Sequence, residues 1–338
     1  MDDVARAARV SKQTISAVIN NKSGISEKTR VRVRQIIARM DYQPNMLAGS
    51  LRAQRSFTVG VVVPSITNPF YPELLRGIED EAQQHGYAVL LCNSDENPEK
   101  ELNYLHLLRR HRIAGIIVAT LKVNALWEEA RDKLAASGVP IVELLGKSRP
   151  DGKVVHVIVD DEDGFVKATT HLLDLGHDRI GMIMPPNITT GEGGPRVAGF
   201  VKAHALQKKK VAPELLASGG WHVQDGKNGA ATLMKLPLPP TAIVAANDMV
   251  AIGAITKLKE LNRRVPEDIA VVGYDNIAIT EWYDPSITTV DQPRYELGRR
   301  AMQAVLKRLE NPNGQAETVK LETSLVVRRS SGGLKSRM

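Results

Sequence analysis

The chain has 338 residues, of which 43% are hydrophobic, and a formal net charge of +7 at pH 7, which allows two or three domains with sizeable cores. Its single cysteine, Cys92, excludes an intramolecular disulfide and with it the disulfide-stapled secreted proteins. No apolar run approaches the roughly 20 residues of a membrane helix, and the N-terminus, MDDVARAARV, lacks the apolar core of a signal peptide, so we expect a protein of the cytoplasm.

The excess positive charge lies in the first sixth of the chain. Residues 1–57 contain eleven Lys or Arg and four Asp or Glu, a balance of 11 − 4 = +7, and the whole chain has 45 − 38 = +7. The remaining 281 residues are therefore neutral, with 34 basic and 34 acidic side chains. A basic head on a neutral body indicates a polyanionic partner for the head, and a solvated basic surface is the alternative that charge alone leaves open.

Residues 1–43 show the pattern of three short helices. Val4 and Ala8 recur at helical spacing in the first. Ser11 and Ser26 precede the second and third, where their side-chain oxygens can accept hydrogen bonds from backbone N–H groups as N-caps. Three short helices with small residues at their crossings predict a helix-turn-helix head over residues 1–43.

The second predicted helix, in VSKQTISAVINN (10–21), is the candidate DNA-binding element. Ile15, Val18 and Ile19 form its apolar face. The other face carries short polar side chains and one methyl group, which suit base edges and phosphates. Its candidate DNA-binding residues are Ser11, Lys12, Gln13, Thr14, Ser16, Ala17 and Asn20. Periodicity alone leaves a groove-binding helix and a solvated helix equally open, and the charge of the head favours the first.

Residues 44–57 predict a hinge helix followed by a linker. Pro44 suits the start of a helix, and NMLAGSLR (45–52) extends over about two turns. Such a short helix is marginal alone in water, and Gly49 costs up to about 1 kcal/mol more. We therefore expect the hinge to be the least stable element.

From residue 58 onward, apolar runs alternate with helical patterns. TVGVVVP, YAVLLCN, AGIIVAT and PIVELLG form one series, and VVHVIVD, IGMIMPP, AIVAAN and IAVVGYD form a second. Apolar strands between helices predict parallel, doubly wound sheets, and two series predict two lobes with a cleft. The expected ranges are 58–157 plus about 288–318 for the first lobe, 158–287 plus about 319–331 for the second, and 332–338 for a flexible tail.

Motifs along essentially the whole chain resemble the LacI/GalR (lactose-repressor-type) family of transcription regulators. These motifs are DDVARAARVSKQTISAVINN, GISEKTRVRVRQIIARMDYQPN, LAGSLR, VGVVVPSITNPFYPELLRGIEDEAQQHGY, HLLDLGHDRIG, RVAGF, AANDMVAIGA, PEDIAVVGYDN and ITTVDQP. The resemblance implies an α plus α/β protein with a helix-turn-helix head, a hinge helix and a homodimeric, type I periplasmic-binding-protein-like core. It also implies that the hinge helix orders on operator DNA, where Leu51 wedges into a minor-groove step. Asn45, at the start of the hinge, is a further candidate DNA contact.

The chain departs from the family pattern at four points. Chains of the family usually begin a few residues before the position of Met1. Arg9 replaces a turn glycine, so a left-handed backbone there would store roughly 1 kcal/mol of strain. Ala17 replaces a frequent recognition arginine, which predicts a different operator sequence. Gly49 replaces a frequent hinge arginine, which makes folding of the hinge less favourable.

The candidate effector residues follow or flank the predicted strands, because α/β sheets bind ligands at the carboxyl ends of their strands. They are Phe70, Tyr71, Thr120, Asp160, Arg196, Trp221, Asn247 and Asp275. Aromatic rings can stack on a sugar or a planar ring, arginine can make a bidentate contact, and aspartates can accept bonds from ligand hydroxyls. All except Thr120 match family effector contacts or neighbouring positions. The alternatives are helix capping for Asn247 and Asp275 and a core position for Phe70.

No residue set predicts catalysis, a cofactor or a metal. GEGGPRVAG (191–199) lacks the strand–glycine–helix context of a dinucleotide site, and DDEDG (160–164) lacks calcium-loop spacing. His171 and His177 are six residues apart and do not form a metal pair. A nucleophile elbow is absent as well.

We therefore expect a sequence-specific DNA-binding transcription regulator, a repressor, controlled by an effector of the sugar type. Its partners would be a pseudo-palindromic operator, the effector and a second copy of the chain, without a membrane, and it would lie at the nucleoid when bound to DNA. The alternative is a small-molecule-binding protein of the same core fold without effective DNA binding. A sugar-transport component would instead carry an export signal and lack the basic head.

Overall fold

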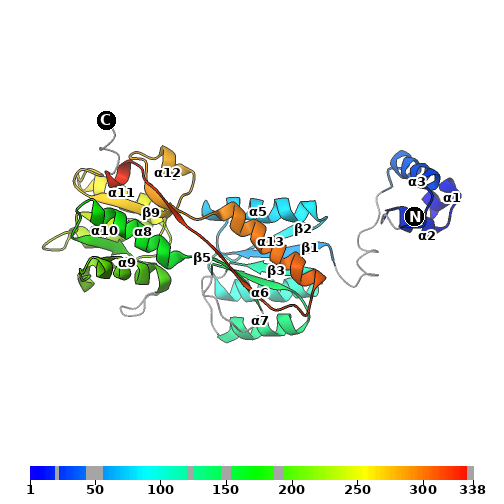
Figure 1. Ribbon diagram of the computed structural model, residues 1–338, viewed down its shortest axis with the longest axis horizontal. Helices are drawn as coiled ribbons and strands as arrows, with labels where there is room; N and C mark the ends of the chain where they lie inside the picture. Colours follow the sequence, from blue (N-terminus) through cyan, green and yellow to red (C-terminus); the bar gives the residue numbers. More distant parts are fainter. Residues whose placement is uncertain (20–22, 43–55, 120–124, 146–153, 186–193, 333–338) are drawn as a thin grey trace. The chain divides into compact units, whose positions relative to one another are not determined.

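The computed structural model describes residues 1–19, 23–42, 56–119, 125–145, 154–185 and 194–332. The chain divides into two compact units, Met1–Ser56 and Phe57–Met338 (Figure 1). Four predicted site residues lie outside the described residues: Asn20, Asn45, Leu51 and Thr120. The same holds for most of the predicted hinge.

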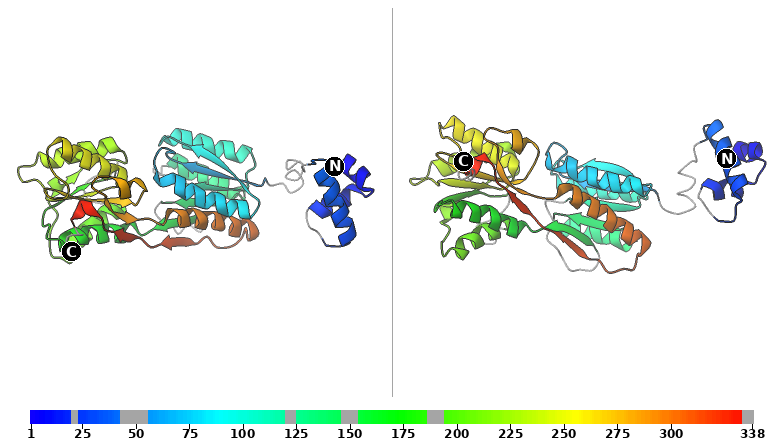
Figure 2. Two further views of the ribbon diagram at one scale, coloured as in Figure 1. Left: turned by 90° about the horizontal axis from the view of Figure 1, so that it is seen from above. Right: turned by 45° about the horizontal axis from the view of Figure 1, so that its top comes forward.

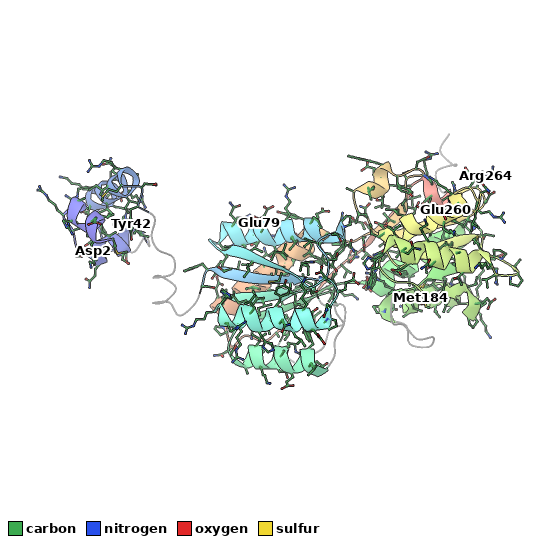
Figure 3. All side chains as sticks on the ribbon, turned by 180° about the vertical axis from the view of Figure 1, so that it is seen from behind. Asp2, Tyr42, Glu79, Met184, Glu260 and Arg264 are labelled. Carbon is green, nitrogen blue, oxygen red and sulfur yellow. The ribbon has the colours of Figure 1, made fainter. Side chains whose placement is uncertain are left out.

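The head consists of three helices around a small apolar core. Their bounds are α1 Asp2–Ala8, α2 Lys12–Ile19 and α3 Glu27–Arg39. The buried side chains that form the core are Val4, Ala5, Ala8, Ile15, Val18 and Val33. Tyr42, labelled in Figure 3, packs against this cluster. The core is small, so the capping bonds at the helix ends contribute a larger share of the stability of the head.

Hydrogen bonds at the helix ends confirm the predicted caps. The Thr14 backbone N–H donates to the Ser11 hydroxyl at 3.1 Å, and the Thr29 N–H donates to Ser26 at 3.4 Å. After α1, Arg9 adopts φ 49° and ψ 48°, the left-handed conformation. The turn before α2 therefore has the geometry for which glycine is suited, and it contains arginine.

The first sheet of the larger unit has the strand order β11-β5-β4-β3-β1-β2, and all its described pairs are parallel. Its strands are β1 Thr58–Val63, β2 Ala88–Asn93, β3 Gly115–Val118, β4 Ile141–Leu144, β5 Val155–Val159 and β11 Thr318–Leu321. Its helices are α5 Phe70–Gln84, α6 Pro98–Arg110, α7 Ala125–Ala136 and α13 Arg294–Glu310. The helices α5 and α13 lie side by side on one face (Figure 2), and α6 and α7 cover the other.

The second sheet has the order β12-β10-β9-β8-β6-β7. Its strands are β6 Ile180–Ile183, β7 Leu216–Ala217, β8 Ala242–Ala245, β9 Ala270–Asp275, β10 Thr288–Asp291 and β12 Ser324–Val326. Its helices are α8 Asp161–Asp174, α9 Gly194–Leu206, α10 Val223–Met234, α11 Asp248–Glu260 and α12 Ile279–Trp282, with 3-10 turns at Pro213–Leu215 and Arg329–Ser331. α8 and α9 pack on one face, and α10 and α11 on the other. The predicted two-lobed, doubly wound core is confirmed, with β12 as the antiparallel strand.

The predicted lobe boundaries were wrong at two strands. The prediction assigned residues 288–291 to the first lobe, but β10 pairs with β9 in the second sheet. It assigned residues 319–321 to the second lobe, but β11 pairs with β5 in the first. The chain therefore passes between the sheets three times, after β5, between β10 and α13, and between β11 and β12. Both strands are short β-branched runs, and long-range pairing decides which sheet such a run joins.

Close helix crossings explain several glycines inside helices. A Cβ on Gly77 would lie 2.0 Å from the Tyr295 backbone oxygen, where α5 crosses α13. A Cβ on Gly253 would lie 1.9 Å from the Val223 backbone oxygen, where α10 meets α11. These contacts require glycine because the two backbones touch.

Candidate effector site and DNA-binding helix

Arg196, in the first turn of α9, is the centre of the predicted effector site. Its Nη1 donates to the Ala246 carbonyl oxygen at 2.6 Å, and its Nη2 lies 3.3 Å from Asp161 Oδ1. The guanidinium lies 4.5 Å from the ring centre of Tyr274 and 5.1 Å from that of Trp221. These contacts hold the planar fork in one orientation.

The charges around Arg196 keep it protonated. Burial alone would lower the pKa of this guanidinium, but the negative charges of Asp161 and Asp275 outweigh burial and raise it. Arg196 is therefore a fixed cation beside aromatic faces, which is an arrangement that can hold a planar or polyhydroxylated ligand.

Asp275 is the last residue of β9 and faces the same region. It is 4% exposed, and it accepts a hydrogen bond from Gln292 Nε2 at 2.6 Å. Its φ of 114° is a left-handed backbone value that a non-glycine residue rarely adopts. Burial raises the pKa of Asp275 to about 7, against the opposing charge of Arg196. The carboxyl group therefore changes its charge near neutral pH.

Asp248, which was not among the predicted site residues, is the first residue of α11 and interacts electrostatically with Asp275. It is fully buried, and it accepts from the Thr289 hydroxyl at 2.6 Å and from the Ile277 N–H at 2.9 Å. Burial, followed by the charge of Asp275, raises its pKa well above the ordinary value. The signal for it was its position directly after Asn247 at the end of a strand.

Tyr71 is the residue of the first lobe that lies near this site. Its side chain is 4% exposed, and its ring meets that of Phe70 edge to face at 5.2 Å. Burial is the main cause that raises the pKa of the Tyr71 hydroxyl, and the charges of Asp275 and Glu96 add to it. Tyr71, Asp275 and Arg196 therefore act on one another electrostatically from two different lobes.

Three other predicted residues have defined structural roles. Asn247 accepts from the Val250 N–H at 2.9 Å as the N-cap of α11, and its amide donates to the Trp221 carbonyl at 3.1 Å. Asp160 caps α8 through the Asp163 N–H at 3.1 Å and pairs with Lys320. Phe70 belongs to the core of the first lobe. Effector contact by these residues stays a prediction beside these roles.

Buried polar atoms without a partner surround Arg196 and Asp275. Among the described residues, they include Gln292 Oε1 and Arg294 Nε. A buried polar group without a hydrogen bond is costly. Sequence reasoning missed them because no spacing brings residues 292 and 294 close to Asp275.

A polar contact joins the two lobes at the residue after Trp221. His222 Nε2 lies 3.1 Å from Glu96 Oε1. Glu96 follows Asp95, and both have a left-handed backbone, with φ values of 58° and 53°. This strained loop after β2 carries the carboxylate toward the second lobe.

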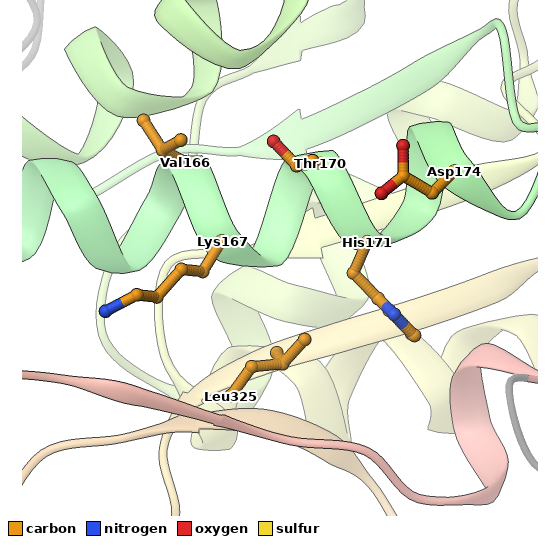
Figure 4. A pocket seen from close by; sticks show the side chains of 6 residues that line it. All are labelled: Val166, Lys167, Thr170, His171, Asp174 and Leu325. Carbon is orange, nitrogen blue, oxygen red and sulfur yellow. The ribbon is translucent and has the colours of Figure 1, made fainter.

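A shallow surface pocket of about 390 Å³ lies elsewhere, on α8 and β12. Its lining residues are Val166, Lys167, Thr170, His171, Asp174 and Leu325 (Figure 4). None of the predicted effector residues lines it. His171 is already bonded to Ser331 at 2.9 Å. Because none of the lining residues belongs to the Arg196 site, the pocket is distinct from it.

The helix α2 has the predicted two faces. Ile15 and Val18 are buried, and Ser11, Lys12 and Gln13 are exposed. Thr14, Ser16 and Ala17 are partly exposed. Lys12 pairs with Asp2 at the start of α1, so a phosphate would compete with that carboxylate for its ammonium group.

A helix-turn-helix head joined to a two-lobed α/β core with a buried polar site defines a ligand-responsive DNA-binding regulator. Residues 1–45 match the model of bacterial regulatory proteins of the lacI family. Residues 56–327 match that of periplasmic binding proteins and the sugar-binding domain of the LacI family. The chain therefore belongs to the LacI family, and it is a DNA-binding transcriptional regulator.

Proteins that are similar along the full length of the chain support the same assignment. The chain is 35% identical to the HTH-type transcriptional regulator DegA of Bacillus subtilis, covering 98% of both chains. It is 32% identical to the HTH-type transcriptional repressor CytR of Escherichia coli, covering 99% of this chain and 96% of that one. These relatives are transcriptional regulators, in agreement with the prediction that the protein is not an enzyme.

Solved structures are also similar. The Lac repressor dimer bound to operator and the anti-inducer ONPF has a TM-score of 0.84 at 28% identity, covering 97% of this chain and 98% of that one. The transcriptional regulator CelR–cellobiose complex has a TM-score of 0.74 at 28% identity, with the same coverage. Among the described residues, no helix is long and apolar enough to cross a bilayer.

Proposed function

We propose that the protein is a homodimeric repressor whose operator binding is controlled by a sugar or sugar derivative. The observation that carries the proposal is the arrangement of Arg196 against aromatic rings, with the Asp275 carboxyl group in the same region. Rings stack on the apolar face of a sugar, while a guanidinium and a carboxylate bond its hydroxyls.

Complexes of similar proteins favour the same effector class. CelR was solved with cellobiose, and a LacI family regulator from Enterococcus faecium, 33% identical over 81% of this chain with a TM-score of 0.71, was solved with bound ribose. The proposed site comprises the predicted residues together with Asp161 and Tyr274, which contact or face Arg196.

Exposed apolar side chains support the homodimer. Leu90 and Leu91 are 39% and 43% exposed on β2, the edge strand of the first sheet. On α12, Trp282 is 84% exposed beside Ile279 at 49%. Large apolar side chains at such positions are typical of surfaces that a partner covers.

Each α2 helix would enter a major groove of a pseudo-palindromic operator, placing the bound dimer at the nucleoid. Leu51 would wedge into the central minor-groove step. The effector acts only through a difference in its affinity for the DNA-competent and DNA-incompetent dimers. The hinge between head and core is the proposed carrier of this coupling.

Operator titration tests the proposal. A duplex selected by the full-length protein should bind more weakly as salt rises, because phosphate contacts release counterions. A panel of sugars and nucleobases should contain a sugar that changes this affinity. Salt-independent binding, or a response to nucleobases alone, would contradict the proposal.

Leu51→Ala separates the wedge from the effector site. This variant should weaken operator binding and leave effector affinity, measured by thermal shift, unchanged. Equal losses of both affinities would remove Leu51 from the proposed role. Met46→Ala, in the same predicted hinge, serves as the control for loss of an apolar side chain.

A further inference from the structure

A group of basic side chains covers the last turn of α6 and the turn after it. It consists of His106, Arg109, Arg110, His111 and Arg112, called here the α6 basic end, and all five are exposed. His106, Arg109 and Arg110 lie on one helix face, because their spacing is i, i+3 and i+4. Among the described residues, none of the five forms an ion pair with an acidic side chain.

Local stability explains only part of this group. Basic residues in the last turn interact favourably with the helix dipole, which accounts for Arg109 and Arg110. Arg112 lies beyond the helix, in the left-handed conformation with φ 49°, and gains little from the dipole. Like charges at helical spacing without acidic partners repel one another. The group therefore fits a negatively charged partner.

The α6 basic end lies at the edge of the first sheet where the chain enters from the head. Arg112 is two residues before Ala114, whose N–H donates to the Thr58 carbonyl at 2.8 Å. Thr58 is the first residue of β1, two residues after the end of the head unit at Ser56. The strand β3 starts beside β1 in parallel register, with Gly115 opposite Val59. The connection between head and core therefore begins next to these basic side chains.

Acidic side chains at this edge do not cancel the charge. Glu317, just before β11, is paired with Lys307 at 3.0 Å. Glu81, in the last turn of α5, lies beside His85 and Arg299, and Glu310 ends α13. Glu81 and Glu317 have basic partners, and the three arginines of the α6 basic end outnumber Glu310. The edge therefore has a net positive charge.

Chain length limits the distance between this edge and DNA held by the head. Residues 43–56 can span at most about 50 Å when fully extended. Duplex DNA advances about 3.4 Å per base pair, so an extension of ten base pairs adds about 34 Å of polyanion. DNA that flanks the bound half-site can therefore come within reach of the α6 basic end.

We propose that the α6 basic end binds backbone phosphates of the DNA flanking the operator, as a second, sequence-independent contact made by the core. This inference rests on the proposed DNA-binding function. It assigns to the core a role in affinity, while base recognition stays with α2. The effect should appear only on duplexes long enough to present the flanks.

The test compares two duplexes and two triple variants of the full-length protein. One duplex contains the selected operator alone, and the other adds ten base pairs on each side. The first variant is Arg109→Gln/Arg110→Gln/Arg112→Gln. The charge-matched control is Lys208→Gln/Lys210→Gln/Lys235→Gln, which removes three exposed charges from the second lobe.

The unmodified protein and the lysine control should bind the long duplex about tenfold more tightly than the short one at low salt, with a steeper salt dependence. The arginine variant should lose this difference and keep the affinity for the short duplex. Equal affinity of the unmodified protein for both duplexes would overturn the inference, as would an arginine variant that retains the difference. Either of these two outcomes leaves the proposed function standing, provided that the protein still binds the short duplex specifically. Failure to bind either duplex specifically would instead contradict the proposed function.

Discussion

Arg196 and Asp161 form an ion pair of 3.3 Å inside the second lobe, and their side chains are only 13% and 16% exposed. Asp161 is the first residue of α8, where a negative charge is also favoured by the helix dipole. Arg196 comes from the first turn of α9. The pair therefore links two helix N-termini and fixes the guanidinium that faces Tyr274.

Removal of this guanidinium should abolish the effector response. In Arg196→Ala, the stacked cation and its hydrogen bond to Ala246 are lost, so the effector should no longer change operator affinity. Arg196→Lys keeps the charge but loses the planar fork, and we expect effector affinity to fall by at least tenfold, about 1.4 kcal/mol. Operator titrations with and without effector measure both effects.

Arg179→Ala is the matched control for Arg196. Arg179 also bonds a carbonyl, that of Leu238 at 2.7 Å, and an acid, Glu214 at 3.1 Å, but it does not contact the rings around Arg196. This control should retain the effector response. An unchanged effector titration of Arg196→Ala would exclude Arg196 from the site.

Asp275 predicts a pH dependence of stability. Its pKa is about 7 when folded, against 3.8 ordinarily, so between these values the folded state binds more protons than the unfolded state. Its contribution to the free energy of unfolding is therefore greatest at low pH and decreases as pH rises toward about 7, with a slope of up to about 1.4 kcal/mol per pH unit. Above about pH 7 the contribution is constant.

Asp275→Asn tests this contribution, together with the effect of the Asp275 charge on the pKa of Asp248. The difference in unfolding free energy between the unmodified protein and the variant, from denaturant titrations at pH 5 to 8, should shrink as pH rises and level off near pH 7. The comparison with the variant is needed because burial lowers the pKa of His171, His177 and His204. The contribution of these histidines to the free energy of unfolding therefore increases as pH rises, opposite to that of Asp275. A difference that is independent of pH would contradict the raised pKa.

The alternation of apolar runs was sufficient to predict the doubly wound lobes, because buried parallel strands leave an unmistakable pattern. It did not decide which lobe receives β10 and β11, since that choice depends on pairing with β9 and β5. In the proposed site, Arg196 and Asp275 are candidates because of their positions at helix and strand ends. Asp248 and Tyr274 were not, because their importance arises from burial and from neighbours distant in the sequence.

Gly253→Ala should destabilise the core strongly. Its Cβ would lie 1.9 Å from the Val223 backbone oxygen, so α10 and α11 must move apart, at an expected cost of about 2 kcal/mol or more. Gly229→Ala, on α10, is the comparison, because the atoms nearest its Cβ, from 2.6 Å, belong to the side chain of Ile183 and not to backbone. Urea denaturation that finds equal losses in both variants would contradict the backbone contact.

The left-handed turn between α1 and α2 gives a final prediction. Arg9 has φ 49° and ψ 48°, which costs a side-chain-bearing residue about 1 kcal/mol relative to glycine. Arg9→Gly and Arg9→Ala remove the same charge, so their difference reports the backbone alone. We expect the head of Arg9→Gly to be more stable than that of Arg9→Ala by about 1 kcal/mol, measured by hydrogen exchange of the α1 and α2 amides. Equal protection in the two variants would mean that this turn relaxes to another conformation in solution.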